Sequence, residues 1–284
     1  MIESPNTEAS LARVWTIEPG GSDQPGLVYA GVDPGALIVS HNNGESWDLC
    51  EALWNHSTRP LWMPGAAGLA LHHIARDPAD SAHLYVGISS AGVFETTDGG
   101  AAWTARNNGC TADHLPTASP EAGQCVHSLQ LHPAKPGRLF QQHHPGVYHS
   151  DDGGANWITI GASLPGVFGF ASTIDPNDGD TFYVIPLQED QARIPAGGSL
   201  RVYRTTDAGE SWQPLGDGLP ESHVLQGVYR QALCNDAAPS SDDLGLYLGT
   251  SGGHVYASRN SGANWSQLLE HAAPVTAVRC AQLN

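Results

Sequence analysis

One eight-residue pattern occurs five times in this chain of 284 residues and restricts what the chain can fold into. The pattern is Ser/Thr-x-Asp/Asn-x-Gly-x-x-Trp, and its tryptophans are Trp47, Trp103, Trp157, Trp212 and Trp265. Successive tryptophans are separated by 56, 54, 55 and 53 residues, so the repeating unit has about 55 residues. A fixed period of this size is typical of repeat architectures, in which each unit is one supersecondary module. We therefore predict a single domain, residues 1–284, built from five copies of one module.

Each module is predicted to form four short antiparallel strands. In the second module, alternating and apolar residues predict strands at 70–75, 83–89 and 93–96, and the repeat motif then leads into a fourth strand at Trp103. Within the motif, the Asp or Asn side chain can accept hydrogen bonds from its own turn, and the glycine permits a positive φ. The tryptophan offers a large apolar ring for packing between sheets. We interpret the motif as structural.

Four-stranded sheets that repeat around an axis make a β-propeller. We therefore predict an all-β propeller with five blades at residues 11–66, 67–122, 123–166, 167–222 and 223–272. An extra C-terminal inner strand is expected at 274–282, with no outer hairpin after it. Either the ring closes with five blades, or free blade edges remain that a second copy covers in a homo-oligomer.

The charge balance excludes two classes of partner. Asp and Glu number 29 against 12 Lys and Arg, which gives a net charge of −17. Nucleic acid and anionic membranes would be repelled, and no apolar run is long enough to span a bilayer. The start of the chain lacks the basic and apolar segments of a secretory signal, and the five cysteines have no paired spacing. We therefore expect reduced thiols and a cytoplasmic protein.

Histidines gather at the beginnings of the expected inner strands. Counting back six residues from the proline that follows each inner strand gives, in the first four modules, Arg13, His72, His127 and Phe170. The fifth module lacks this proline, and Arg230 or Gln231 takes the position. All of these positions should lie on the face opposite to the repeat motifs. The turn that contains His143 and His144 joins the same face.

Imidazoles that converge from several strands can hold a transition metal, most readily zinc, and leave one position for water. Such a water becomes a nucleophile near neutral pH. We therefore predict His72, His127, His143 and His144 as metal ligands. Neighbours on a strand face opposite ways, so His73 is not expected beside His72, and only one of His143 and His144 would join a given site. A polar axial channel without metal is the competing interpretation.

Residues on the surrounding loops complete the expected site. Glu121 and Glu189 are candidate general bases, and Arg230 is a further candidate catalytic residue. The candidates for substrate binding are Arg13, Trp54, Trp62, Gln142 and Phe170. Together these residues predict a hydrolase that uses a divalent metal on small esters, phosphoesters (including phosphotriesters) or lactones. The alternative is a non-catalytic propeller that binds glycans or proteins.

The sequence also resembles the Asp-box, or bacterial neuraminidase repeat, propellers. The resemblance rests on the five motifs and on the stretches ARVWTIEPG, GQCVHSLQLHPAKPGRLFQQHHPGVYHSDDGG and LRVYRTTDAGESWQPL, which look like the uncharacterised bacterial subgroup named exo-sialidase-like. It implies the propeller fold and adds sialidase-type glycoside hydrolysis as an alternative. Sialidases hold a carboxylate with three arginines, and Arg13, Arg230 and Arg279 lie on expected inner strands. The sialidase Tyr–Glu pair has no counterpart, because Tyr229 adjoins Arg230 and faces the other way.

Overall fold

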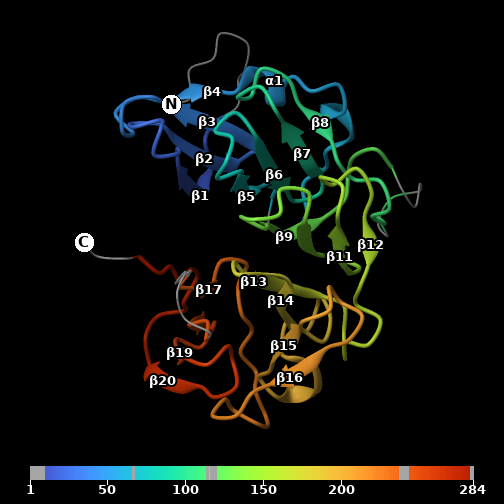
Figure 1. Cartoon of the computed structure of the whole chain (residues 1–284), viewed down its shortest axis with the longest axis vertical. Helices are drawn as coiled ribbons and strands as arrows, with labels where there is room; N and C mark the ends of the chain where they lie inside the picture. The colour runs from blue at the N-terminus through green and yellow to red at the C-terminus, as the bar shows by residue number, and fades with distance from the viewer. Residues whose placement is uncertain (1–9, 66–67, 113–114, 116–119, 237–242, 282–284) are drawn as a thin grey trace. The chain divides into compact units, whose positions relative to one another are not determined.

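Five four-stranded sheets make up the computed structural model of the chain, and in each sheet the strand order follows the chain (Figure 1). The structure describes residues 10–65, 68–112, 115, 120–236 and 243–281. The first sheet contains β1 (Arg13–Pro19), β2 (Val28–Asp33), β3 (Ala36–Ser40) and β4 (Asp48–Leu49). The second contains β5 (Leu71–Arg76), β6 (Leu84–Ile88), β7 (Gly92–Thr96) and β8 (Thr104–Ala105).

The remaining three sheets repeat this order. The third contains β9 (Val126–Leu131), β10 (Leu139–His143), β11 (Val147–Ser150) and β12 (Ile158–Thr159). The fourth contains β13 (Gly169–Asp175), β14 (Asp178–Pro186), β15 (Val202–Thr205) and β16 (Gln213–Leu215). The fifth contains β17 (Leu233–Asn235), β18 (Leu246–Gly249), β19 (Val255–Ser258) and β20 (Ser266–Leu269). A four-stranded antiparallel meander is the blade of a β-propeller, so the predicted all-β propeller fold with five blades is confirmed.

The chain divides into two compact units. The first comprises residues 1–137 and 150–157, and the second comprises residues 138–149 and 158–284. Strand β9 belongs to the first unit, and strands β10 and β12 belong to the second. Three short helical segments, α1 (Glu51–Trp54), η1 (Arg59–Leu61) and η2 (Ala196–Gly198), lie in the loops between strands. Among the described residues, no helix has the length and apolar character that a membrane span requires.

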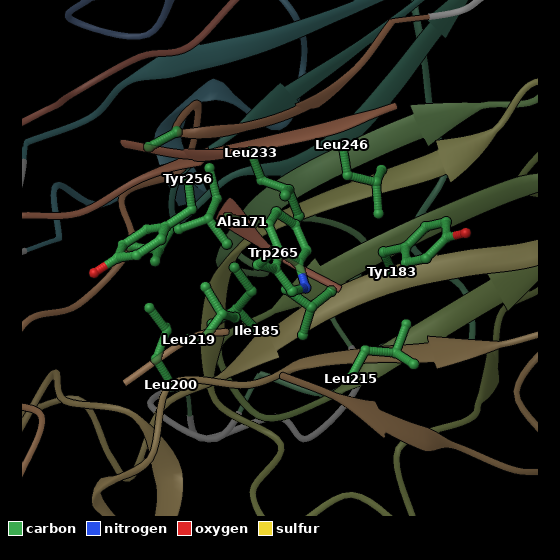
Figure 2. Close-up of a cluster of buried hydrophobic side chains, with 14 of the residues drawn as sticks. Ala171, Tyr183, Ile185, Leu200, Leu215, Leu219, Leu233, Leu246, Tyr256 and Trp265 are labelled. Atoms are coloured by element: carbon green, nitrogen blue, oxygen red, sulfur yellow. The ribbon is translucent and has the colours of Figure 1, made fainter. Parts of the chain in front are cut away.

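Each unit has an apolar core of its own. In the first unit, Leu71, Val86, Phe94 and Trp103 belong to one buried cluster. In the second unit, a larger cluster joins side chains from the fourth and fifth sheets, and Figure 2 shows Trp265 of the fifth motif among them. The members labelled there are Ala171, Tyr183, Ile185, Leu200, Leu215, Leu219, Leu233, Leu246, Tyr256 and Trp265. Burial of such surface is the main favourable term in folding, so the motif tryptophan connects a local turn to the core.

The repeat motifs close their turns with one recurring set of hydrogen bonds. The Ser40 hydroxyl donates to Asn42 Oδ1 (2.9 Å) and accepts the N–H of Gly44 (2.8 Å), while Asn42 Oδ1 accepts the N–H of Ser46 (2.9 Å). The same three bonds occur in the other four motifs. In the fourth motif, hydrogen bonds from Ser211 and Thr205 lower the pKa of the Asp207 carboxyl to about 2. The turns are therefore built as predicted, with the Asp or Asn side chain as the acceptor for its own backbone.

The chain after β20 differs from the expected inner strand at 274–282. Within the described part of this segment there is no strand; Ala277 makes an isolated parallel bridge with Gln231 in the second unit. Val275 and Val278 pack against Gly249 of β18. The segment is therefore attached to the fifth sheet by one short parallel contact. Its hydrogen bonds to that sheet are too few to make it a strand.

Candidate functional site

The inner strands β1 and β5 of the first unit contain a β-bulge near their beginnings. In the second sheet, Leu71 pairs with Ile88 and His73 with Gly87, so His72 is the extra residue. In the first sheet, Val14 pairs with Val32 and Thr16 with Gly31, so Trp15 is the extra residue. A bulge bends the strand and re-aims the side chain that it contains. It also corrects the register inferred from the prolines: Trp15, not Arg13, occupies the position of His72.

The bulge brings His72 and His73 together, contrary to the expectation that they face opposite ways. Their Nδ1 atoms are 2.9 Å apart, and their rings meet edge to face. The outer nitrogen of each ring contacts a serine: His72 Nε2 lies 3.0 Å from Ser89 Oγ, and His73 Nε2 lies 3.3 Å from Ser128 Oγ of β9. Strict alternation holds only in a regular strand, and His72 lies where the strand is irregular. His72 is fully buried, and the Trp15 ring meets it edge-on.

A second pair of side chains of the kinds that can ligate a metal lies at the beginning of β9, also in the first unit. His127 Nε2 is 3.5 Å from Cys125 Sγ. His127 is buried and Cys125 is partly exposed. These residues are two positions apart in sequence, which places them on one side of the strand. The first unit therefore contains three histidines and one thiol at the beginnings of neighbouring inner strands.

The other two predicted ligands belong to the second unit. His143 is buried at the end of β10, with its ring edge-on to Tyr148. His144 is partly exposed; its Nε2 atom lies 4.0 Å from Asp190 Oδ2, and its ring meets Phe168 edge to face. His144 therefore has an acidic neighbour on the loop between β14 and β15.

Phe170 of β13 and the predicted residue Arg230 meet in the second unit. The guanidinium of Arg230 lies 4.6 Å from the centre of the Phe170 ring, and that of Arg193 lies 5.3 Å from it. Arg193 is exposed and its Nε–H donates to the Asp190 carbonyl (3.0 Å). Two guanidinium groups therefore lie near one aromatic ring, in a protein of strongly negative charge.

Three other residues predicted to contact substrate, Trp54, Trp62 and Gln142, make contacts within the protein. The Arg59 guanidinium lies 3.9 Å from the Trp54 ring centre and 4.8 Å from that of Trp62, and burial lowers the pKa of Arg59 to about 10. Trp62 is buried, and its indole N–H donates to Thr58 Oγ1 (3.0 Å). The Gln142 amide is also buried and donates to the carbonyls of His143, Gly146 and Val167.

The remaining predicted residues are at the surface. Arg13 is exposed and pairs with Asp33 across the first sheet, and its guanidinium lies 5.0 Å from the Trp15 ring centre. Glu121 in the first unit and Glu189 in the second unit are both exposed. Glu121 lies a few residues before Cys125, on the loop that leads into β9, whereas Glu189 lies on the loop after β14. Neither carboxylate is desolvated.

Sequence reasoning missed a buried ionic network in the first unit. Glu95 Oε1 accepts hydrogen bonds from Tyr85 (2.7 Å) and His83 (2.9 Å), and Glu95 Oε2 accepts one from Arg106 (2.7 Å). His83 Nδ1 also contacts Asp77 Oδ2 (3.1 Å). Burial alone would raise the pKa of Glu95, but the hydrogen bonds from Tyr85, His83 and Arg106 outweigh it, and the pKa is lowered. The pairing of Tyr85 with Glu95 across β6 and β7 was the available signal.

A surface cavity of about 430 Å³ lies in the first unit, at the end of the strands that carries the repeat motifs. Tyr29, Cys50, Glu51 and Asp98 are among the residues that line it. In the second sheet, Thr96 of the motif pairs with Leu84, whereas Leu71 pairs with Ile88 at the other end. This cavity is therefore separate from His72 and His73, which lie at the opposite end of the second sheet.

Comparison with known proteins gives a likeness of fold. No protein-family model matches the sequence, and no curated protein is similar to it. An ancestral GH74 enzyme matches 92% of this chain and 32% of its own, at 17% identity and a TM-score of 0.61. The GH74 xyloglucanase from Xanthomonas campestris matches 90% of this chain and 38% of its own, at 17% identity and a TM-score of 0.60.

A third structure with the same fold is not described as an enzyme. It is the extracellular domain of a putative one-component system from B. thetaiotaomicron, which matches 92% of this chain and 28% of its own, at 14% identity and a TM-score of 0.55. The chain thus spans about a third of the length of these proteins. Identities this low establish the β-propeller fold and leave the activity to be argued from the residues.

Proposed function

We propose that the chain is a metal-dependent hydrolase whose metal is held by histidines at the beginnings of the inner strands in the first unit. The observation that carries this proposal is the 2.9 Å approach of the His72 and His73 Nδ1 atoms. Two imidazole nitrogens that face each other at this distance share either one proton or one metal ion, because two N–H groups would collide. Neighbouring nitrogen ligands of one zinc ion are themselves roughly 3 Å apart.

The serine contacts support the metal alternative. Each ring has its Nε2 atom beside a serine hydroxyl, Ser89 for His72 and Ser128 for His73. A hydroxyl that accepts the Nε2–H proton fixes the tautomer in which Nδ1 carries a lone pair, as partners of metal-binding histidines commonly do. In that tautomer each Nδ1 atom carries a lone pair that can bind a metal.

Further donors are available in the same unit. His127 and Cys125 offer an imidazole and a thiol at the beginning of β9, 3.5 Å apart. Ser128 of the same strand already contacts His73, so β9 and β5 are neighbours at this level. A zinc ion held by His72 and His73 would activate a water molecule and polarise an ester or phosphoester oxygen. Glu121 is the candidate general base on the loop that leads into β9.

The test is metal content together with turnover. We expect the full chain, loaded with zinc and dialysed, to retain about one zinc per chain by elemental analysis, and to hydrolyse a chromogenic aryl ester, lactone or phosphotriester. His73→Gln should lose the metal and the turnover while keeping the wild-type melting temperature of the metal-free protein. His271→Gln is the matched control, because the His271 side chain is 84% exposed and belongs to the second unit. A wild-type protein that retains no zinc, nickel or copper would overturn the proposal.

A second candidate function, binding of an acidic glycan, is favoured by the second unit. Arg193 and Arg230 both lie on the Phe170 ring, and aromatic rings with arginines suit a sugar that carries a carboxylate. The GH74 structures belong to enzymes, and one of them is named as a xyloglucanase. Their sequence identity to this chain is too low for their substrates to be assigned to it. Binding of acidic oligosaccharides that Arg193→Gln abolishes, in a protein without metal or turnover, would select this candidate.

We also infer that the chain is a member of the Asp-box propellers. The inference is supported by the five motifs, which share one hydrogen-bond pattern in every repeat. Crystal structures of the chain and of exo-sialidase-like relatives would test it, because members of one family should superpose blade by blade with the motifs in register.

A further inference from the structure

Two cysteines with no paired spacing in the sequence meet in the second unit. Cys234 lies in β17, and Cys280 lies in the segment after β20. Their Sγ atoms are 3.6 Å apart, and both thiols are reduced in this structure. Cys234 is half-buried beneath the segment, whereas Cys280 is exposed.

The register of the C-terminal segment explains this meeting. Ala277 forms a parallel bridge with Gln231, and the Val278 N–H donates to the Gln231 carbonyl (2.9 Å). Residues 277 and 231 are 46 positions apart, and the same separation relates Cys280 to Cys234. In a parallel pair, residues in register project to the same side. The two thiols therefore face each other because the segment is docked in this register.

Packing fixes the segment in the same position. The Val275 N–H donates to the Thr250 carbonyl (3.1 Å). A Cβ atom at Gly249 would collide with Val275 Cγ1 and lie 3.1 Å from Val278 Cγ2, so the segment fits because residue 249 has no side chain. The contact between the cysteines is thus part of a docked surface.

We propose that Cys234 and Cys280 form a disulfide bond that fastens the C-terminal segment to the fifth sheet when the protein meets a small-molecule disulfide such as oxidised glutathione. The Cys280 thiolate attacks one sulfur of the oxidant, forming a mixed disulfide and releasing one thiol. The Cys234 thiolate then attacks the Cys280 sulfur, closing the protein disulfide and releasing the second thiol. Two protein thiols are oxidised and one disulfide of the oxidant is reduced, so the exchange balances. The modification is independent of the proposed metal centre.

The order of attack follows from exposure and charge. Burial raises the pKa of the Cys234 thiol to about 12, with a further contribution from Cys280. Burial also raises the pKa of Cys280, but Cys280 is the one that the oxidant can reach. Because the thiolate is the nucleophile, the reaction should be slow at pH 7 and accelerate about tenfold for each unit that the pH rises toward 9.

The other described thiols have different surroundings. Cys50 donates to the Gly100 carbonyl (3.6 Å), Cys110 is fully buried, and Cys125 lies beside His127. They lie in the first unit. We therefore expect one disulfide per chain and three thiols that remain free.

The experiment incubates the metal-free full chain with a series of glutathione redox buffers at pH 8, blocks free thiols by alkylation, and maps the peptides without reduction. We expect a linked peptide pair that contains Cys234 and Cys280, and three alkylated cysteines. The oxidised protein should have a higher melting temperature than the reduced protein, and the Cys280 peptide should be cleaved more slowly by proteases. Cys280→Ser should lose all three effects, whereas Cys50→Ser should behave as the wild type.

Two outcomes would overturn the proposal. In the first, the strongest oxidising buffer links neither cysteine, or links Cys280 to another chain or another cysteine. In the second, the Cys234–Cys280 link forms but neither the melting temperature nor the proteolysis of the segment changes. A Cys234→Ser protein that still forms a mixed disulfide at Cys280 would confirm that Cys280 is attacked first; a mixed disulfide at Cys234 in Cys280→Ser would show the reverse order and contradict the mechanism.

Discussion

The Glu95 carboxylate is a buried charge of the first unit with three side-chain partners. It is 7% exposed and accepts hydrogen bonds from Tyr85, His83 and Arg106. A hydrogen bond to a charged group contributes about 1.5–3 kcal/mol to stability, and a neutral amide cannot replace three of them. We expect Glu95→Gln to lower the free energy of unfolding by about 3 kcal/mol, measured by urea denaturation. Glu45→Gln, at an exposed position, should leave it within about 0.5 kcal/mol of the wild type.

The same residue predicts a direction for the pH dependence. The folded-state pKa of Glu95 is lowered, so the unfolded chain takes up its proton at a higher pH than the folded chain. The stabilisation from Glu95 is then complete above the unfolded pKa, about 4.3, and disappears as the pH falls through the folded value. Unfolding free energies measured between pH 7 and pH 3 should converge for the wild type and Glu95→Gln. A gap that stays constant over this range would contradict the assignment.

Individual residues also show what sequence reasoning could not reach. The positions of His72 and His127 on inner strands follow from the repeat, and both lie in the first unit. The contact between His72 and His73 was not predictable, because alternation along a strand forbids it and only the bulge permits it. The Glu95 network was not predictable for a related reason: it joins side chains from two strands and the loops beside them, whereas the repeat relates only equivalent positions of different modules.

At the scale of the element, the repeat motif was the most predictable feature, since its chemistry is local. The Trp157 ring is buried, and its N–H donates to the Arg106 carbonyl (2.8 Å). Truncation of a buried aromatic residue costs about 3–5 kcal/mol, so we expect Trp157→Ala to lose that much unfolding free energy. Trp157→Phe should lose about half as much, because it keeps most of the apolar contact and loses the hydrogen bond. A Trp157→Ala protein that keeps the wild-type melting temperature would show that the ring is not part of the scaffold.

The segment after β20 was the least predictable element, because its pairing is not local. Its bridge joins Ala277 to Gln231, and its valines depend on the missing side chain at Gly249. Deleting residues 274–284 should expose the surface of Gly249 and its neighbours and promote self-association, which sedimentation velocity measures. Gly249→Ala should reproduce the effect in the full chain, since the added Cβ displaces Val275. A truncated protein that sediments as the wild type does would show that the segment is dispensable.

At the scale of the molecule, the period of the tryptophans was enough to predict five four-stranded sheets. The reason is that each module can bury its apolar face only against another module, so the repeat determines the architecture. The site was less predictable because it depends on bulges and loops, which differ from module to module. The likeness to GH74 structures also concerns the fold and not the site. It extends over most of the chain, but the sequence identity is only 17%.

The net charge of −17 predicts how salt changes the stability of the whole molecule. At pH 7, 29 acidic side chains repel one another in the compact state and are balanced by 12 basic ones. Sodium chloride screens this repulsion, with a Debye length of about 30 Å at 0.01 M and about 10 Å at 0.1 M. Salt also weakens ion pairs such as that of Arg138 with the exposed Asp180 carboxylate, and a pair with an exposed partner contributes little. We therefore expect the melting temperature at pH 7 to rise by a few degrees between 0.01 M and 0.3 M salt.

At pH 5, close to the isoelectric point of about 5.0, the net repulsion vanishes and the rise should disappear. An equal rise at both pH values would mean that salt acts through solvation of the surface and not through the acidic charge.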